Sequence, residues 1–218
     1  MAEFENELCP RFEHRALFND SELPALLSLL AEEIFVERRY LSPVVQTVYF
    51  LPLSGKTGEG YLRARRCIGC SDVTEEILRL QADDIWQLEE KALNGVKKRV
   101  FLPMGQIVAY FKGKEIFPIA STQMERRHFL DQSGTARVTV DSPAQYFAFV
   151  PELDLTTGRL MGKQSRMKLE IKDYSPGGNL SLVNRLFTGI RCEFIPDGWH
   201  EDEVRRMFMK FLAEQEKC

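Results

Sequence analysis

The 218-residue sequence lacks the features that identify membrane and secreted proteins. Its longest apolar runs, Leu26 to Leu30 and Val44 to Leu53, contain polar residues and are far too short to cross a bilayer. The opening segment, MAEFENELCPRFEHR, is acidic and has neither the basic start nor the apolar middle of a signal peptide. We therefore expect a cytoplasmic chain without a transmembrane segment.

A disulfide framework and an excess of positive charge are also absent from the sequence. The five cysteines form an odd set without the spacing of a disulfide framework, which favours a reducing compartment. The formal net charge of −3 argues against the broad basic surface that duplex nucleic acid or an anionic membrane would need. Any anion site must therefore be a local concentration of basic residues.

The chain also lacks internal repeats and any Pro/Gly/Ser-rich linker, so we expect residues 1–218 to form a single domain. Short strand-like segments separated by Gly, Pro, Asp and Ser predict an α+β protein built on an antiparallel sheet or barrel. Segments 44–53 with 61–67, and 85–93 with 96–103, are expected to form hairpins. QIVAYFKG (106–113) is expected to be another strand, and helices are expected over 21–35, 71–81, 179–187 and 199–218.

Charged residues alternate with other residues in the expected strands, and alternate residues share one face of a strand. The charged face could be ordinary solvated surface, but its richness in Arg favours phosphate, because the planar guanidinium matches phosphate oxygens. A closed barrel with a charged interior explains the pattern if the helices at 21–35 and 200–215 cover its apolar outside. The alternating sets are Glu13 and Arg15; Arg63 and Arg65; Glu89 and Lys91; Arg137, Thr139 and Asp141; and Lys168, Glu170 and Lys172.

Over roughly residues 11 to 190, the order of short motifs resembles the VTC domain of polyphosphate polymerases. These motifs are F-E-x-R, T-V-Y-F, L-R-A-R, L-E-x-K with V-K-x-R, E-R-R-x-F, R-V-T-V-D and L-E-I-K. The VTC domain belongs to the triphosphate tunnel metalloenzyme superfamily, together with CYTH-type triphosphatases. The resemblance implies an antiparallel β-barrel tunnel that binds a nucleoside triphosphate and polyphosphate.

The resemblance also implies the residues of the site. Glu170 is the expected ligand of a Mn²⁺ or Mg²⁺ ion, and the catalytic cations are Arg63, Arg65, Lys91, Arg126 and Arg137. The full set of expected phosphate-binding residues is Arg15, Arg63, Arg65, Lys91, Lys97, Arg126, Arg137 and Arg185. Arg stands where the family usually has Lys at positions 15 and 185, which keeps the charge but changes its reach.

Three activities remain open at this point. The first is ATP-dependent synthesis of polyphosphate, the second is hydrolysis of an inorganic or nucleoside triphosphate, and the third is binding of polyphosphate or inositol phosphates without catalysis. Triphosphatases of the superfamily typically begin E-x-E-x-K, whereas this chain has F-E-H-R, with Glu13 and no Glu at position 15. The smaller number of carboxylates favours the polymerase-like branch. A membrane or regulatory partner is also left open.

Overall fold

The computed structural model describes residues 12–38, 44–52, 61–68, 85–91, 97–112, 116–148, 158–175, 178–196 and 199–215. Its strands form a 12-stranded antiparallel sheet in the order β12-β1-β11-β8-β7-β3-β4-β5-β6, with β2, β9 and β10 paired off this path. The strands are β1 (Phe12–Phe18), β2 (Val36–Arg38), β3 (Val44–Pro52), β4 (Tyr61–Ile68), β5 (Ile85–Lys91), β6 (Lys97–Pro103), β7 (Ile116–Leu130), β8 (Ala136–Asp141), β9 (Gln145–Ala148), β10 (Arg159–Lys163), β11 (Met167–Asp173) and β12 (Cys192–Phe194). The helices are α1 (Leu23–Glu32), α3 (Met104–Lys112), α4 (Leu180–Thr188) and α5 (Trp199–Gln215). The α+β antiparallel class expected from the sequence is confirmed.

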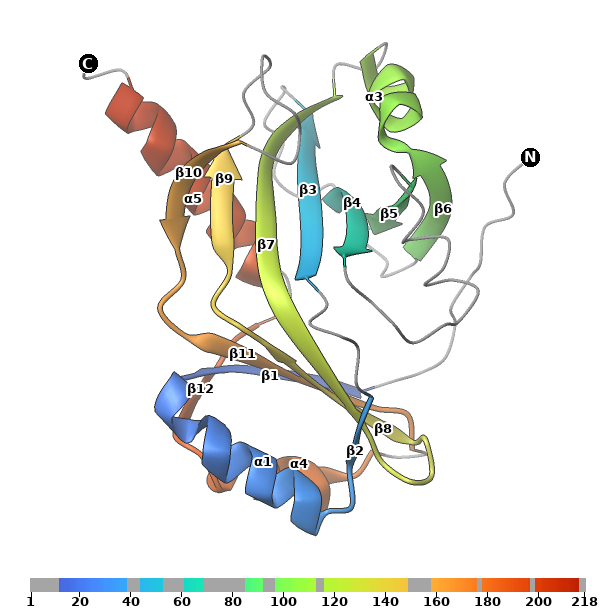
Figure 1. Ribbon diagram of the computed structural model, residues 1–218, viewed down its shortest axis with the longest axis vertical. Coiled ribbons are helices and arrows are strands. Elements are labelled where there is room, and N and C mark those ends of the chain that lie inside the picture. Colours follow the sequence, from blue (N-terminus) through green and yellow to red (C-terminus); the bar gives the residue numbers. More distant parts are fainter. Residues whose placement is uncertain are drawn as a thin grey trace.

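Strand β7 connects two parts of this sheet (Figure 1). Its first part pairs with β3 and β9, and its last part pairs with β8 and β2. The expected closure into a barrel is wrong for the described strands, because the path ends at β12 and β6, which do not pair with each other. Both edges of β7 are occupied, so the sheet branches at this strand.

Helices α1 and α4 cover one face of the part formed by β1, β8 and β11. Alternation in these strands sends apolar side chains to that face, where Val138, Leu169 and Ile171 are fully buried. Leu26 of α1 and Leu186 of α4 pack against them. The helices expected at 21–35 and 179–187 are thus confirmed, and α1 covers the apolar side as expected.

Helix α3 covers the same side of the second part of the sheet. This segment was expected to be a strand, and that expectation is wrong. Met104, Ile107 and Phe111 recur at helical spacing and are buried against Phe50 and Trp86, so helical burial decides the conformation. The expected helix at 71–81 and both expected hairpin turns lie outside the described residues.

Helix α5 lies on the other side of the sheet. Its Val204 packs with Val45, Tyr49 and Met124, whose side chains lie on the side of the sheet that faces away from α1, α3 and α4. Many of the charged residues of the strands lie on this same side. The terminal helix is confirmed, but the expectation that it covers the apolar outside is wrong. Because α5 is amphipathic, its apolar side could pack on either face of the sheet. Among the described residues, no helix combines the length and the apolar character needed to cross a bilayer.

Candidate functional site

Strand register gathers the charged residues on one face of the sheet. Directly opposed residues in neighbouring strands point to the same side, and Arg126 on β7 opposes Asp141 on β8, which opposes Lys168 on β11. In the other part of the sheet, Arg65 on β4 opposes Thr47 on β3, and Thr47 opposes Thr122 on β7. Thr122 lies on the same face of β7 as Met124 and Arg126, because the three residues alternate along the strand. We call this side the charged face. Its described charged residues include Glu13, Arg15, Arg63, Arg65, Glu89, Arg99, Arg126, Arg137, Asp141, Lys168, Glu170 and Lys172, with Glu201 added by α5.

Asp141 is the most enclosed carboxylate of the charged face, with only 1% of its side chain exposed. Arg126 donates two hydrogen bonds to it, Nε to Oδ1 at 2.5 Å and Nη2 to Oδ2 at 2.8 Å. Lys168 Nζ lies 2.8 Å from Oδ2. Burial alone would raise the pKa of Asp141, but the two cations outweigh it and hold that pKa far below its usual range. Asp141 therefore stays ionised and fixes both cations.

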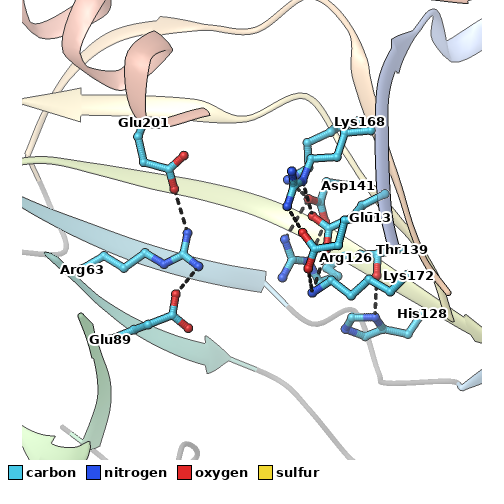
Figure 2. Close-up of polar contacts among 12 residues, drawn as sticks. Glu13, Arg63, Glu89, Arg126, His128, Thr139, Asp141, Lys168, Lys172 and Glu201 are labelled. Carbon is cyan, nitrogen blue, oxygen red and sulfur yellow. Dashed lines mark hydrogen bonds and ion pairs between the residues drawn. The ribbon is translucent and has the colours of Figure 1, made fainter. Parts of the chain in front are cut away.

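A second group joins β1 to β11 beside the first (Figure 2). Lys172 Nζ lies 2.9 Å from Glu170 and 3.7 Å from Glu13, and Arg15 pairs with both carboxylates. Burial alone would raise the pKa of Glu170, but Lys172, Lys168 and Arg15 hold it well below its usual range. Two carboxylates thus meet at one lysine.

Arg63 is the centre of a third group, on the other part of the sheet. It donates to Glu89 at 2.5 Å and to Glu201 of α5 at 3.0 Å (Figure 2). Arg99 donates to the second oxygen of Glu89 at 3.1 Å. A carboxylate from α5 therefore occupies one side of a guanidinium that belongs to the sheet.

Arg65 and Arg137 are two further arginines of the charged face. The Nε atom of each is buried and has no hydrogen-bond acceptor in the part of the chain that is described. Burial lowers the pKa of Arg65 to about 10, and the positive charges of Arg63 and Arg126 add to the lowering. A buried donor without an acceptor is costly, so both arginines favour the arrival of an anionic ligand.

Two histidines lie among these cations. His128 on β7 is 3.2 Å from the Thr139 hydroxyl, and burial together with Arg126 and Arg137 lowers its pKa to about 3. Burial lowers the pKa of His200 on α5 well below its usual range, and Lys168, Arg63 and Arg126 lower it further. Both rings are therefore neutral at physiological pH, inside a cationic surface.

The residues of the charged face fit a hard divalent cation in a limited way. Within the described ranges, no group of three His, Cys, Asp or Glu side chains is placed to hold a metal ion. Mg²⁺ needs only one or two carboxylates when phosphate oxygens and water complete its shell, however. Glu13 and Glu170, which both contact Lys172, are the pair with the right chemistry.

The charged face includes most of the residues that were predicted from the sequence to bind phosphate or metal. Arg15, Arg63, Arg65, Arg126, Arg137 and Glu170 all lie on it. Lys91 and Lys97 oppose each other at one end of the β5–β6 pair, and their side chains are outside the described part. Arg185 is elsewhere: it projects from α4 on the opposite side of the sheet, is 60% exposed, and pairs with Glu33 at 2.6 Å.

Several residues of the charged face had no site role in the sequence interpretation. The alternating pattern of charges already contained Lys168, Lys172 and Asp141. Their proximity to the predicted phosphate-binding arginines follows only from the strand order, which the sequence does not give. His128 is two residues from Arg126 on the same strand, a spacing that places both on one face. His200 and Glu201 gave no local signal, because their position depends on where α5 packs.

No protein-family model matches this sequence, and no curated protein matches it. Among solved structures, the PH1819 protein from Pyrococcus horikoshii is 12% identical, over 95% of this chain and 99% of that chain, with a TM-score of 0.51. A proposed adenylyl cyclase from Hippeastrum, whose structure is described as revealing a dominant triphosphatase activity, is 14% identical over 85% of this chain and 91% of its own, with a TM-score of 0.48. A proposed adenylate cyclase from Vibrio parahaemolyticus is 10% identical over 82% and 84%, with a TM-score of 0.47. The likeness to the Pyrococcus protein shows that this chain shares its fold over nearly the whole length.

Proposed function

We propose that the charged face binds a chain of phosphates and catalyses metal-dependent phosphoryl transfer, with ATP-dependent polyphosphate synthesis as the reaction. One observation carries the proposal. A row of basic side chains crosses β4, β7, β8 and β11 on one side of the sheet, and its arginines include Arg65 and Arg137, each with a buried Nε that has no acceptor among the described residues. The motif order that resembles VTC domains supports the same substrate class.

The charges of the face suit a polyanion rather than a single small anion. Basic residues outnumber the acidic ones, and they are spread over several strands instead of meeting at one point. Without a ligand the cations repel one another. This repulsion is the second cause of the lowered pKa of Arg65, and burial is the first. A phosphate chain would relieve this repulsion and supply several acceptors to the guanidinium groups.

In the proposed reaction, the bond between the terminal phosphorus of ATP and its bridging oxygen breaks, and ADP leaves. A terminal oxygen of the polyphosphate chain forms the new bond to that phosphorus. Such a transfer depends on positioning and charge stabilisation more than on covalent help from the protein. Arg63, Arg126 and Arg137 would hold the phosphates in line, and Lys168 would neutralise charge that develops on the oxygens.

Glu13 and Glu170 would hold the Mg²⁺ or Mn²⁺ ion of this reaction. When bound, such an ion neutralises phosphate oxygens and keeps donor and acceptor together. In the structure both carboxylates pair with Arg15 and Lys172. Those two cations would be free to bind phosphate oxygens once the carboxylates have another partner.

Hydrolysis of a triphosphate is the second candidate, and the position of Glu13 favours it. Glu13 and Glu170 lie on adjacent strands and contact the same lysine, so the face offers a pair of carboxylates rather than the single one expected from the sequence. A second carboxylate would help to hold a metal and its water. The two reactions share their binding residues and differ in the acceptor.

Incubation of the full chain with ATP and Mn²⁺ separates these activities. Polyphosphate resolved on a gel, together with ADP, supports the polymerase. Release of monophosphate from ATP or tripolyphosphate supports hydrolysis. Tight binding of tripolyphosphate by calorimetry without either product would indicate a binding protein, and absence of binding would overturn the proposal.

The metal role of Glu170 has its own test. We expect Glu170→Gln to abolish turnover while leaving tripolyphosphate binding in the absence of metal intact or stronger, because a negative charge is removed from the face. The matched control is Glu90→Gln, which changes an exposed residue of β5 next to Glu89. Retained turnover in the Glu170 variant would refute the metal role.

A further inference from the structure

His200 is the second residue of α5 and lies where this helix meets the charged face. Its ring packs among three aromatic side chains, with centroid distances of 5.9 Å to Tyr49, 6.2 Å to Tyr146 and 6.4 Å to Trp199. The next residue, Glu201, is bound to Arg63. The ring is therefore held in place by the same packing that seats α5 on the sheet.

The polar atoms around this ring are incompletely satisfied. His200 Nε2 is buried and has no hydrogen-bond partner within the ranges described, and the same holds for the Tyr146 hydroxyl. Tyr146 is fully buried. Buried polar atoms in folded proteins almost always have partners, so two such atoms in adjacent side chains indicate a place for a polar group that the described residues do not supply.

The charges that act on His200 come from both parts of the sheet. Lys168 and Arg126 act from one part and Arg63 acts from the other, while Asp141 partly opposes them. On α5 itself, Glu201 is held by Arg63. Tyr49 and Tyr146 are the other titratable groups that face the ring, and burial raises the pKa of each, so both stay neutral. His200 therefore lies close enough to both the Arg63 group and the Asp141 group to feel their charges.

We propose that His200 is a further binding residue of the phosphate site, and that it takes up a proton from solvent when the phosphate chain binds. This inference rests on the proposed function of the charged face. A phosphate chain that contacts both Arg63 and Lys168 would come near the imidazole, and a protonated ring would donate a charge-assisted hydrogen bond to a phosphate oxygen.

The direction of the proton follows from the charges. Without ligand, burial and nearby cations keep the ring neutral. A bound polyanion brings several negative charges to the same place, which favours the imidazolium. Because the ring binds a proton more tightly in the complex, linkage requires the phosphate to bind more tightly as the pH falls through the range where the ring becomes protonated in the complex.

Histidine NMR gives a direct test, because the chain has only three histidines. Full-length protein labelled with ¹³C and ¹⁵N in histidine is titrated with sodium tripolyphosphate at pH 7, and ring signals are assigned with single His→Gln variants. We expect the His200 signals to move from the neutral to the protonated position. His14 lies on the opposite side of the sheet beside Phe187 and serves as the internal control.

Calorimetry on His200→Gln supplies a second measurement. Glutamine keeps a hydrogen-bond donor but cannot titrate, so the variant should lose the pH dependence contributed by one proton, up to about tenfold in affinity per pH unit between pH 6.5 and 8.5. Comparison with the wild type cancels the titration of tripolyphosphate itself, and His14→Gln should behave as the wild type does.

Two results would overturn the inference, and they can be told apart. If the wild type binds tripolyphosphate while His200 stays neutral at saturation and His200→Gln keeps the wild-type pH dependence, the proposed function stands and the role of His200 is refuted. If calorimetry detects no tripolyphosphate binding by the wild type, both proposals fail.

Discussion

Asp141 is a buried carboxylate that fixes Arg126 and Lys168. We expect Asp141→Asn to lower the free energy of unfolding by roughly 3–5 kcal/mol, because removal of one partner leaves buried cations without compensation. Urea denaturation of both proteins measures the difference.

The exposed ion pair between Arg166 and Glu193 is the control for this prediction. Its atoms are 2.6 Å apart, but the Glu193 side chain is 64% exposed. Glu193→Gln should cost no more than about 1 kcal/mol, because water solvates both charges. If Asp141→Asn and Glu193→Gln lower the free energy of unfolding equally, burial does not increase the contribution of the Asp141 group to stability.

The same carboxylate predicts how stability depends on pH. The pKa of Asp141 is lowered in the folded protein, so its contribution is present above the unfolded pKa of about 3.9 and is lost as the pH falls through the lower folded value. We expect the free energy of unfolding to fall more steeply between about pH 5 and pH 2 in the wild type than in Asp141→Asn. Urea titrations at several pH values give both slopes, and identical slopes would contradict the prediction.

Arg65 and Arg66 are neighbours on β4 with opposite surroundings. Arg65 lies on the charged face with an unsatisfied Nε, whereas Arg66 donates to Gln46 at 2.7 Å and stacks on Trp86 at 4.7 Å on the other side. Arg65→Gln should weaken tripolyphosphate binding by roughly 1.5–3 kcal/mol, the value of a hydrogen bond to a charged group. Arg66→Gln should leave that affinity unchanged and lower stability instead. Calorimetry and urea denaturation of both variants separate binding from stability, and equal affinity losses would show that the position on the sheet does not matter.

At the scale of elements, α5 presents a carboxylate to the charged face. Glu201 holds Arg63 at 3.0 Å and would compete with a phosphate oxygen for the same guanidinium. We expect Glu201→Gln to raise the affinity for tripolyphosphate about tenfold, which corresponds to about 1.4 kcal/mol. Calorimetry at fixed ionic strength measures the change.

Asp202→Asn is the matched control for Glu201→Gln. It removes the same charge from the same turn of α5, but Asp202 is exposed. Both substitutions weaken the favourable interaction of an acidic side chain with the helix N-terminus equally, so only the contact with Arg63 differs. An equal gain in affinity in both variants would show that net charge, and not this contact, limits binding.

The strands and their facing residues could be predicted from the sequence. Charged residues alternate with mostly apolar ones in β1, β8 and β11, and this period of two predicts which face of its own strand carries Arg15, Arg137 or Glu170. The pairing of β3 with β4 and of β5 with β6 also follows the expected hairpins. Local pattern was sufficient here because one face of each strand packs against apolar residues.

The elements that the sequence did not predict depend on tertiary packing. QIVAYFKG contains β-branched and aromatic residues that suit a strand, and only burial of Ile107 and Phe111 against the sheet favours the helix. Arg185 matched a motif position, but α4 carries it on the opposite side of the sheet, where it pairs with Glu33. The residue pattern of α5 does not determine which face of the sheet the helix packs on. The positions of His200 and Glu201 on the charged face could therefore not be predicted from the sequence.

For the whole molecule, the unbalanced charges predict strong ligand stabilisation. A ligand present at 100 times its Kd stabilises the folded state by about 2.7 kcal/mol, which for a chain of this size raises Tm by roughly 5–10 °C. We expect tripolyphosphate to do this at low salt and to lose part of the effect at high salt, as screening weakens the contacts. Differential scanning fluorimetry measures both shifts.

Monophosphate at equal ionic strength is the control for this stabilisation. A single phosphate can contact only one part of the charged face, so it should raise Tm much less than tripolyphosphate does. Equal shifts with both anions would indicate general ionic effects and would contradict a site for a phosphate chain. An unchanged Tm at millimolar tripolyphosphate would count equally against it.

The pairing of β1 with β11 also affects how the chain folds. Arg15 and Glu170 are neighbours in the sheet but are separated by 155 residues in the sequence. During synthesis β1 therefore emerges long before its two partners β11 and β12, with its hydrogen-bonding edges unpaired. Pairings of such long range slow folding and expose strand edges to aggregation. Completion of the charged face is thus expected among the last steps of folding, and protection of β1 amides from hydrogen exchange should develop later than that of the β3–β4 hairpin.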